Sequence, residues 1–126
     1  MIVLDTHAWV WSVDAPRRLP KAARQAIERA DRIGVSTMSV FEFVQLVQRR
    51  RITLEIPLRA WVRDALARDR VEPLPLTADI ALDAAQLHFE ASPADRIIYA
   101  TARAAHAQLV TRDERLRKFD PELTVW

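Results

Sequence analysis

The fold is constrained most by short apolar runs that alternate with longer segments of helical periodicity. Residues 2–4, 33–36 and 108–110 have the length and apolar character of buried strands, and residues 71–74 form a weaker run interrupted by proline. A last edge strand is expected over residues 123–126. Helices are predicted at about residues 20–31, 38–50, 57–66, 77–88 and 92–106, with a short one after Thr111. Strands that alternate with helices favour an α/β fold, in which a central parallel β-sheet is flanked by helices.

Composition limits the class of protein. The chain of 126 residues has the length of one domain, and we predict a single domain over residues 1–126. It contains no cysteine, which excludes disulfides and thiolate metal sites and suits a reducing cytoplasm. No apolar run approaches the roughly 20 residues of a membrane span. Asp5 directly follows the first apolar run and no basic segment precedes that run, so we expect a cytoplasmic protein without a signal peptide or membrane anchor.

Several familiar catalytic patterns are missing from the sequence. Gly34 is its one glycine, so the chain has neither a phosphate-binding glycine-rich loop nor a dinucleotide-binding fingerprint. No serine lies in the nucleophile-elbow pattern of the α/β-hydrolases. His7, His88 and His106 lack the paired spacing of zinc ligands, which makes structural or surface roles the simpler interpretation.

Positive charge is concentrated in one part of the chain. The net charge is only +2, but residues 17–70 contain 13 Lys or Arg and 6 Asp or Glu. Nearly all the basic residues are arginines, whose forked guanidinium groups bind phosphate bidentately, so a nucleic-acid partner is one interpretation. Solvated helix faces in an arginine-rich sequence are the other, and charge alone does not separate the two.

Four carboxylates follow the predicted strands. Asp5 comes directly after the first strand, and Glu42 lies in the helix after the second. Asp95 lies in the first turn of a helix opened by residues 92–93, and Asp113 follows the strand at 108–110. Ligands of parallel sheets collect at the carboxyl ends of the strands, so these side chains are expected to converge. Gathered carboxylates repel one another, and Mg²⁺ or Mn²⁺, which prefer oxygen ligands, would remove that repulsion.

Three of these carboxylates also have a structural interpretation. Asp95 stands three residues after Ser92 in a capping-box pattern, Asp113 falls in the first turn after Thr111, and Asp5 is placed to cap a helix beginning at the next residue. Glu42 is different, because its apolar neighbours predict a helix buried nearly all round. A lone carboxylate there would be hard to ionise without a partner.

Arginines and tryptophans supply further candidates. Five arginines are candidates for contacts with a nucleic-acid backbone: Arg49, Arg50, Arg51, Arg96 and Arg112. The run at 49–51 is equally well interpreted as a solvated helix end, where cations are favoured. Trp9 and Trp11 are two residues apart and cannot share one narrow helix face, so one of them is a candidate for a dimer or partner groove.

Four motifs, in order along nearly the whole chain, resemble those of PIN-domain proteins. They are residues 2–8 (Ile-Val-Leu-Asp-Thr-His-Ala), 36–42 (Ser-Thr-Met-Ser-Val-Phe-Glu), 93–102 (Pro-Ala-Asp-Arg-Ile-Ile-Tyr-Ala-Thr-Ala) and 109–116 (Leu-Val-Thr-Arg-Asp-Glu-Arg-Leu). The short length is most similar to VapC-type toxins of type II toxin–antitoxin systems. The resemblance implies a PIN-like three-layer fold, Mg²⁺- or Mn²⁺-dependent endoribonuclease activity, a homodimer and neutralisation by a small antitoxin protein.

The same resemblance implies roles for particular residues. It assigns Asp5, Glu42, Asp95 and Asp113 to the catalytic and metal-binding site, with Thr6 and Thr111 at polar positions that support it. Many relatives have Asp where Ser92 stands. Serine still caps the following helix, so this departure affects a local contact and leaves the carboxylate set intact.

Three alternatives stay open on the sequence alone. A magnesium phosphatase or phosphotransfer receiver would use a similar sheet, although here the acids are spread over helices. A non-catalytic RNA-binding or regulatory module would share the fold and lack the activity. A PIN-type nuclease of RNA maturation would share the activity and lack an antitoxin. The RNA target leaves no code in one chain, because RNA recognition depends on shape and unpaired bases.

Overall fold

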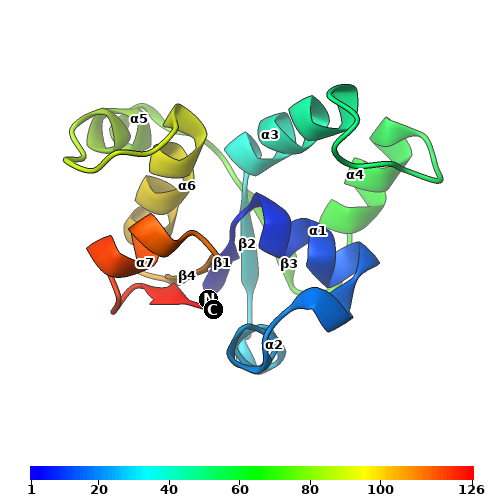
Figure 1. Ribbon diagram of the computed structural model, residues 1–126, viewed down its shortest axis with the longest axis horizontal. Coiled ribbons are helices and arrows are strands. Elements are labelled where there is room, and N and C mark those ends of the chain that lie inside the picture. The colour runs from blue at the N-terminus through cyan, green and yellow to red at the C-terminus, as the bar shows by residue number, and fades with distance from the viewer.

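A five-stranded parallel sheet forms the centre of the computed structural model, which describes residues 1–126 (Figure 1). The strands are β1 (Ile2–Leu4), β2 (Ile33–Ser36), β3 (Val71–Leu74), β4 (Gln108–Val110) and β5 (Thr124–Val125), in the spatial order β3-β2-β1-β4-β5. The helices are α1 (Thr6–Asp14), the short 3₁₀-helix η1 (Pro16–Arg18), α2 (Lys21–Arg29), α3 (Thr37–Gln48), α4 (Leu58–Leu66), α5 (Ala78–Ala85), α6 (Pro93–Ala104) and α7 (Glu114–Phe119). All neighbouring strands are parallel, which confirms the predicted α/β fold.

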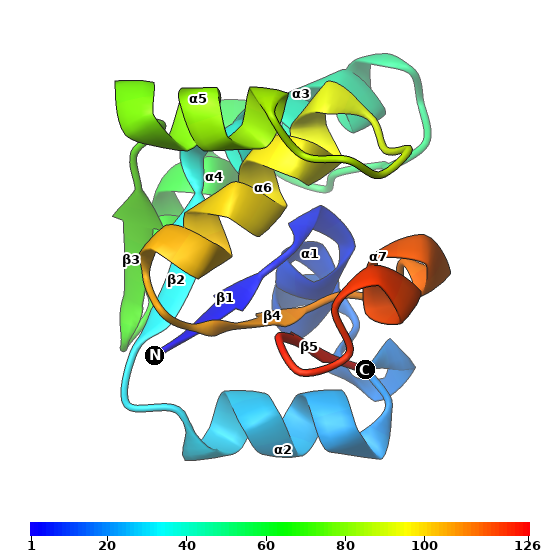
Figure 2. The same cartoon turned by 90° about the vertical axis from the view of Figure 1, so that its left-hand side faces the viewer.

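The first strand of the chain lies in the middle of the sheet. Val3 pairs with Gly34 of β2 on one side and with Leu109 of β4 on the other. Successive side chains of a strand point to opposite faces. Ile2 and Leu4 therefore join the core that contacts α1 and α2, whereas Val3 joins the core under α6 and α7. The sheet is the middle of three layers, and Figure 2 shows α2 and α6 on opposite sides of it.

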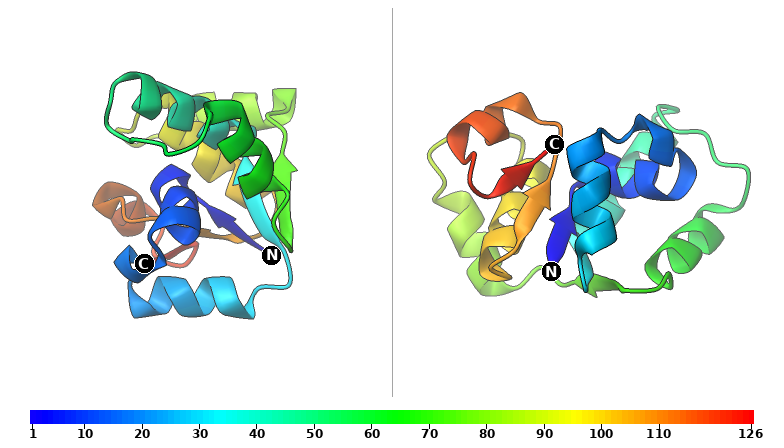
Figure 3. Two further views of the ribbon diagram at one scale, coloured as in Figure 1. Left: turned by 90° about the vertical axis from the view of Figure 1, so that its right-hand side faces the viewer. Right: turned by 90° about the horizontal axis from the view of Figure 1, so that it is seen from below.

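Aromatic side chains fill the larger of the two cores. Trp9, Phe43 and Trp61 come from α1, α3 and α4, are nearly inaccessible to solvent and contact one another. The ring of Phe43 stacks on that of Trp61 with 4.2 Å between their centroids. These contacts join α4 to α1 and α3, and Figure 3 shows α4 beside β3. Trp11 is half-buried, in agreement with the expectation that two tryptophans so spaced cannot share one helix face.

The helices differ from the sequence prediction in burial and in length. The prediction that α3 is buried nearly all round is wrong. Phe41 is 57% exposed, and Ser39 and Phe43 are the only buried residues of the helix. Helices α3 and α6 end two residues earlier than predicted, close to Arg50 and His106 in the left-handed region, with φ of 58° and 51°. A residue in the left-handed conformation commonly ends a helix, and residues other than glycine can adopt this conformation. None of the helices is long and apolar enough to span a bilayer.

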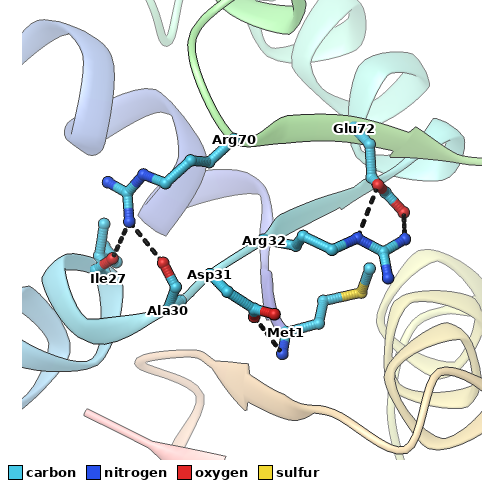
Figure 4. Close-up of polar contacts among 7 residues, drawn as sticks. All are labelled: Met1, Ile27, Ala30, Asp31, Arg32, Arg70 and Glu72. Carbon is cyan, nitrogen blue, oxygen red and sulfur yellow. Dashed lines mark hydrogen bonds and ion pairs between the residues drawn. The ribbon is translucent and has the colours of Figure 1, made fainter.

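Paired charges hold the amino end of the sheet together (Figure 4). The N-terminal ammonium group donates to Asp31 at 3.0 Å, and Arg32, just before β2, forms a two-pronged ion pair with Glu72 of β3. Arg70, just before β3, donates to the carbonyl oxygens of Ile27 and Ala30 at 3.1 and 2.6 Å. The last carbonyl groups of α2 thereby gain a partner that the helix itself does not provide.

Candidate functional site

Asp5 connects the central strand to helix α1. Its backbone N–H donates to the carbonyl oxygen of Val110 at 3.0 Å, which extends the pairing of β1 with β4 by one residue. Its carboxylate caps α1 by accepting from the N–H of Ala8 at 2.8 Å, as the sequence predicted. Burial raises the pKa of Asp5 to about 6 against the opposing hydrogen bonds from Thr111 and Ala8, and the nearby carboxylates add to the rise. Asp5 is thus both a structural cap and a carboxylate in an unfavourable electrostatic position.

Glu42 reaches the same region from the second turn of α3. The hydroxyl group of Thr6, which is 1% exposed, donates a hydrogen bond to its carboxylate. Burial raises the pKa of Glu42, the hydrogen bond from Thr6 opposes this, and the charge of Asp95 adds to it. Thr6 therefore links Glu42 of α3 to the start of α1, and the supporting role expected for Thr6 in the site stays a prediction.

Asp95 projects from the first turn of α6. Its backbone N–H donates to the side-chain oxygen of Ser92 at 3.1 Å, so the serine forms the predicted cap. Burial raises the pKa of Asp95, hydrogen bonding with Ser92 opposes the rise, and the charge of Asp113 adds to it. Ser92 therefore orients Asp95 without neutralising it.

Asp113 is the N-cap of α7. Its carboxylate accepts from the N–H groups of Arg115 and Leu116 at 2.9 and 3.2 Å. Thr111 accepts from the N–H of Asp113 at 3.1 Å and fixes the loop between β4 and the helix. The predicted place of Asp113 inside the first turn, with Thr111 as the cap, is therefore wrong by two residues, because the carboxylate competes better for the free N–H groups.

All four carboxylates line one cavity of about 510 Å³. Its lining contains no hydrophobic residue and consists of Asp5, Thr6, His7, Glu42, Asp95, Arg112, Asp113, Glu114 and Arg115. The ion pairs of the chain lie elsewhere, so none of these carboxylates is within 4.0 Å of a basic group. The four carboxylates, which follow β1, β2 and β4 or lie at the start of α6, thus share one cavity without an ion pair to offset their negative charge.

The donor chemistry of this cavity suits a hard divalent cation. All four side chains offer carboxylate oxygens, the ligands that Mg²⁺ and Mn²⁺ prefer. The upward shift of the pKa of Asp5, Glu42 and Asp95 is what carboxylates without a counter-ion show. As the side chains stand, no three acidic or histidine groups are close enough together to hold an ion. The chemistry of the donor groups thus fits such a cation, whereas the spacing of the side chains does not by itself define a metal site.

Of the five arginines predicted to contact a nucleic acid, one lines the carboxylate cavity and four do not. Arg112 lines the carboxylate cavity, whereas Arg96 does not and keeps a buried Nε without a hydrogen-bond partner. Arg49, Arg50 and Arg51 are exposed at and beyond the end of α3, outside the cavity. The sequence analysis missed two lining residues, Glu114 and Arg115. Both stand within the fourth motif, next to Asp113, and that position is the signal that identifies them.

Comparison with known protein families identifies the class of protein to which this fold and this carboxylate cavity belong. The family model described as the PIN domain matches residues 2–121, and the chain belongs to this family. It is 40% identical to Ribonuclease VapC22 of Mycobacterium tuberculosis over 129 positions, which cover 99% of this chain and 98% of that protein. The predicted resemblance to VapC-type PIN-domain proteins is thereby confirmed.

Solved structures share the fold at low sequence identity. A toxin–antitoxin complex from Klebsiella pneumoniae superposes with a TM-score of 0.73 at 20% identity and covers 100% of this chain and 97% of its own. VapBC2 from Rickettsia felis, bound to a promoter DNA fragment, gives 0.70 at 17% identity, with 98% and 97% covered. VapC20 of Mycobacterium tuberculosis, a toxin that cleaves the sarcin-ricin loop, gives 0.65 at 22% identity, with 94% and 95% covered.

Proposed function

We propose that this protein is a Mg²⁺- or Mn²⁺-dependent endoribonuclease and the toxin of a toxin–antitoxin pair. The observation that carries the proposal is the single cavity lined by Asp5, Glu42, Asp95 and Asp113, none of which has a basic partner. The ribonuclease name of a relative that is 40% identical over nearly all of both chains supports the same activity. We also propose that residues 1–126 act as one domain, in the cytoplasm where RNA is found.

The four carboxylates are the residues that would hold the cation. When bound, the cation supplies charge that stabilises the negative phosphate as the transition state forms. The protein's own part is to keep the ligands oriented. Thr6 holds Glu42, while the N–H of Ala8 and the side chain of Thr111 hold Asp5.

Hydrolysis of the phosphodiester bond also needs a base. We assign that role to Asp95 or Asp113, which lie on neighbouring helix starts and face the same cavity. One of them accepts a proton from water as the water oxygen attacks phosphorus in line. The bond from phosphorus to the 3′-oxygen breaks, and the departing oxygen takes up a proton. The products would carry a 5′-phosphate and a 3′-hydroxyl group.

The proposed partners follow from charge and from relatives. Arg112, with Arg96 and the arginines at 49–51, would contact the RNA backbone and make binding sensitive to salt. The similar structures from Klebsiella pneumoniae and Rickettsia felis contain toxin–antitoxin pairs, which supports a small antitoxin partner for this chain. We propose a homodimer on the strength of the family resemblance.

Cleavage of a mixed RNA pool tests the proposal. The unsubstituted protein should cleave RNA with Mg²⁺ and stop when EDTA is added, and Glu42→Gln should be inactive in both conditions. Glu90→Gln is the matched control, since Glu90 is exposed and does not line the cavity. Activity in EDTA, or full activity of Glu42→Gln, would defeat the proposed mechanism.

Expression in cells separates the toxin from the two other PIN-domain functions. A toxin should arrest growth when it is expressed alone, and Asp5→Asn should relieve the arrest. A nuclease of RNA maturation should cleave RNA without arresting growth, and a binding module should behave identically with and without the substitution. A short reading frame for a partner protein beside the gene would favour the toxin.

A further inference from the structure

A second cavity, of about 490 Å³, adjoins the carboxylate cavity. It is bounded by α1, by η1 and by the segment that follows α3, and we call it the Trp11 cavity. His7 and Arg112 line both cavities and form the wall between them. Anything bound in the Trp11 cavity therefore lies next to whatever occupies the carboxylate site.

Trp11 holds two guanidinium groups in this cavity. The guanidinium carbon of Arg18 lies 4.2 Å from the centroid of the indole ring, and that of Arg112 lies 5.1 Å from it. A guanidinium that is held on an aromatic face keeps its N–H groups free to bind phosphate bidentately. Trp11 is itself braced by the rings of His7 and Trp126, at 6.0 and 5.8 Å between centroids.

The positive charge of the cavity is not matched by acids. Arg18, Arg51 and Arg112 line it, and none of them takes part in an ion pair. Asp14 is its one acidic residue, and both of its carboxylate oxygens accept from the indole N–H of Trp61, at 3.1 and 3.2 Å. The cavity thus presents three unpaired cations beside a site of four carboxylates.

We propose that the Trp11 cavity binds one nucleotide of the RNA strand next to the bond that is cleaved. Arg18 and Arg112 hold its phosphate, Trp11 positions them, and the base lies against the apolar wall formed by Val10, Leu46 and Ile52. The inference rests on the proposed ribonuclease function. The volume of the Trp11 cavity lies within the roughly 300–1,000 Å³ of small-molecule sites, which is enough for a nucleotide.

The shared wall favours RNA over an acidic peptide as the occupant. The carboxylate cavity repels a polyanion, so an RNA strand needs cationic contacts immediately beside it. The Trp11 cavity supplies them within one nucleotide's reach, with Arg112 common to both sites. A protein partner has no such need to extend into the carboxylate cavity.

Binding of a labelled single-stranded RNA of about ten nucleotides, followed by fluorescence anisotropy in EDTA, tests the proposal without cleavage. Arg18→Gln should weaken binding about tenfold, the loss of one charge-assisted contact. It should also make the slope of log affinity against log salt concentration less negative by about 0.7. Arg17→Gln is the matched control, because Arg17 is an exposed neighbour on η1 that does not line the cavity. It should change affinity less than about twofold.

A second variant guards against a merely structural effect. RNA should quench part of the tryptophan fluorescence of the unsubstituted protein, and Trp11→Phe, which keeps an aromatic ring, should remove part of that quenching. Equal affinities of Arg18→Gln and Arg17→Gln, or no RNA binding by the unsubstituted protein, would overturn the proposal. An acidic peptide of alternating Glu and Leu that binds through Arg18, while RNA binding ignores Arg18, would also overturn it and assign the cavity to a protein partner.

The two proposals fail in different ways. If Mg²⁺-dependent cleavage is present and Arg18→Gln binds RNA normally, the nucleotide subsite is wrong and the ribonuclease function stands. If RNA binding depends on Arg18 but no RNA is cleaved with Mg²⁺, the Trp11 cavity binds RNA but is not part of a cleavage site, and the nuclease assignment is wrong.

Discussion

The two ends of the parallel sheet carry charge in opposite ways. At the amino end, Asp31 pairs with the N-terminal ammonium group, Arg32 pairs with Glu72, and Arg70 binds backbone carbonyl groups (Figure 4). At the carboxyl end, four carboxylates share one cavity and no ion pair. The comparison shows that the paired charges of the amino end favour the folded chain, whereas the carboxylates of the carboxyl end are held at a cost in stability.

The difference appears in the direction of the pKa shifts. The ammonium group lowers the pKa of Asp31, so folding favours its charged form. Burial raises the pKa of Asp5 to about 6 and raises that of Glu42 and Asp95, so folding disfavours the charged forms of these three carboxylates. Clusters of this second kind are typical of functional sites, although structural networks also shift pKa values.

The largest expected effect is that of a substitution at the carboxyl end on the rate of RNA cleavage. Asp5→Asn should lower the rate of RNA cleavage at least about hundredfold, because it removes one of four charged ligands. Asparagine caps helices as well as aspartate does, so α1 should persist. Asp31→Asn at the amino end is the control and should cleave at the normal rate. Similar rates for the two variants would contradict the assignment of function to the carboxyl end.

The next effect is stabilisation by the cation. Mg²⁺ at about a hundred times its dissociation constant should stabilise the unsubstituted protein by about 2.7 kcal/mol, because only the folded chain assembles the ligands. For a domain of this size that is a rise of roughly 5–20 °C in melting temperature, at about 2–8 °C per kcal/mol. Calorimetry should show the rise for Asp31→Asn and lose it for Asp5→Asn. NaCl at equal ionic strength controls for screening, and an equal rise with it would argue against a specific site.

A smaller effect is the pH dependence of the metal-free protein. Asp5 binds its proton more tightly when folded, since its pKa rises from 3.8 to about 6. Its contribution to the free energy of unfolding therefore falls as the pH rises through this interval and stays low above it. We expect a loss of about 1 kcal/mol after allowing for partial solvent access. The difference between the unsubstituted protein and Asp5→Asn in urea titrations should show this slope, and a flat difference would contradict the shift.

The smallest effect concerns the amino end itself. Glu72→Gln removes one partner of a largely exposed ion pair, whose side chains are 56% and 35% accessible. Such pairs contribute about 0.2–1 kcal/mol, so the melting temperature should fall by a few degrees at most and cleavage should be unchanged. A fall in cleavage would indicate that the two ends are coupled through β2 and β3.

Much of this arrangement could be predicted from sequence because it depends on short local patterns. The apolar runs identified β1, β2 and β4, and the acids just beyond them identified Asp5 and Asp113 as neighbours at one end of a parallel sheet. Glu42 and Asp95 followed from their places near helix starts. The capping roles of Asp5 and Ser92 were predictable for the same reason.

The remainder depends on packing between distant segments. The exposure of Phe41 was missed because α3 lies over the sheet with one face only. The early ends of α3 and α6 were missed because Arg50 and His106 adopt a conformation usually reserved for glycine. The Trp11 cavity is formed by segments around residues 7–18, 46–53 and 112, which no local pattern connects.

The central position of β1 has a consequence for synthesis of the protein. This strand is made first, but it pairs with β4, and the loop after β4 carries Asp113. A chain that is still emerging from the ribosome contains Asp5 and Glu42 long before it contains the strand and the fourth carboxylate that complete their surroundings. For the nuclease proposed here, strand order therefore delays activity until nearly the whole polypeptide has been released, at which time a partner protein is able to meet a finished surface.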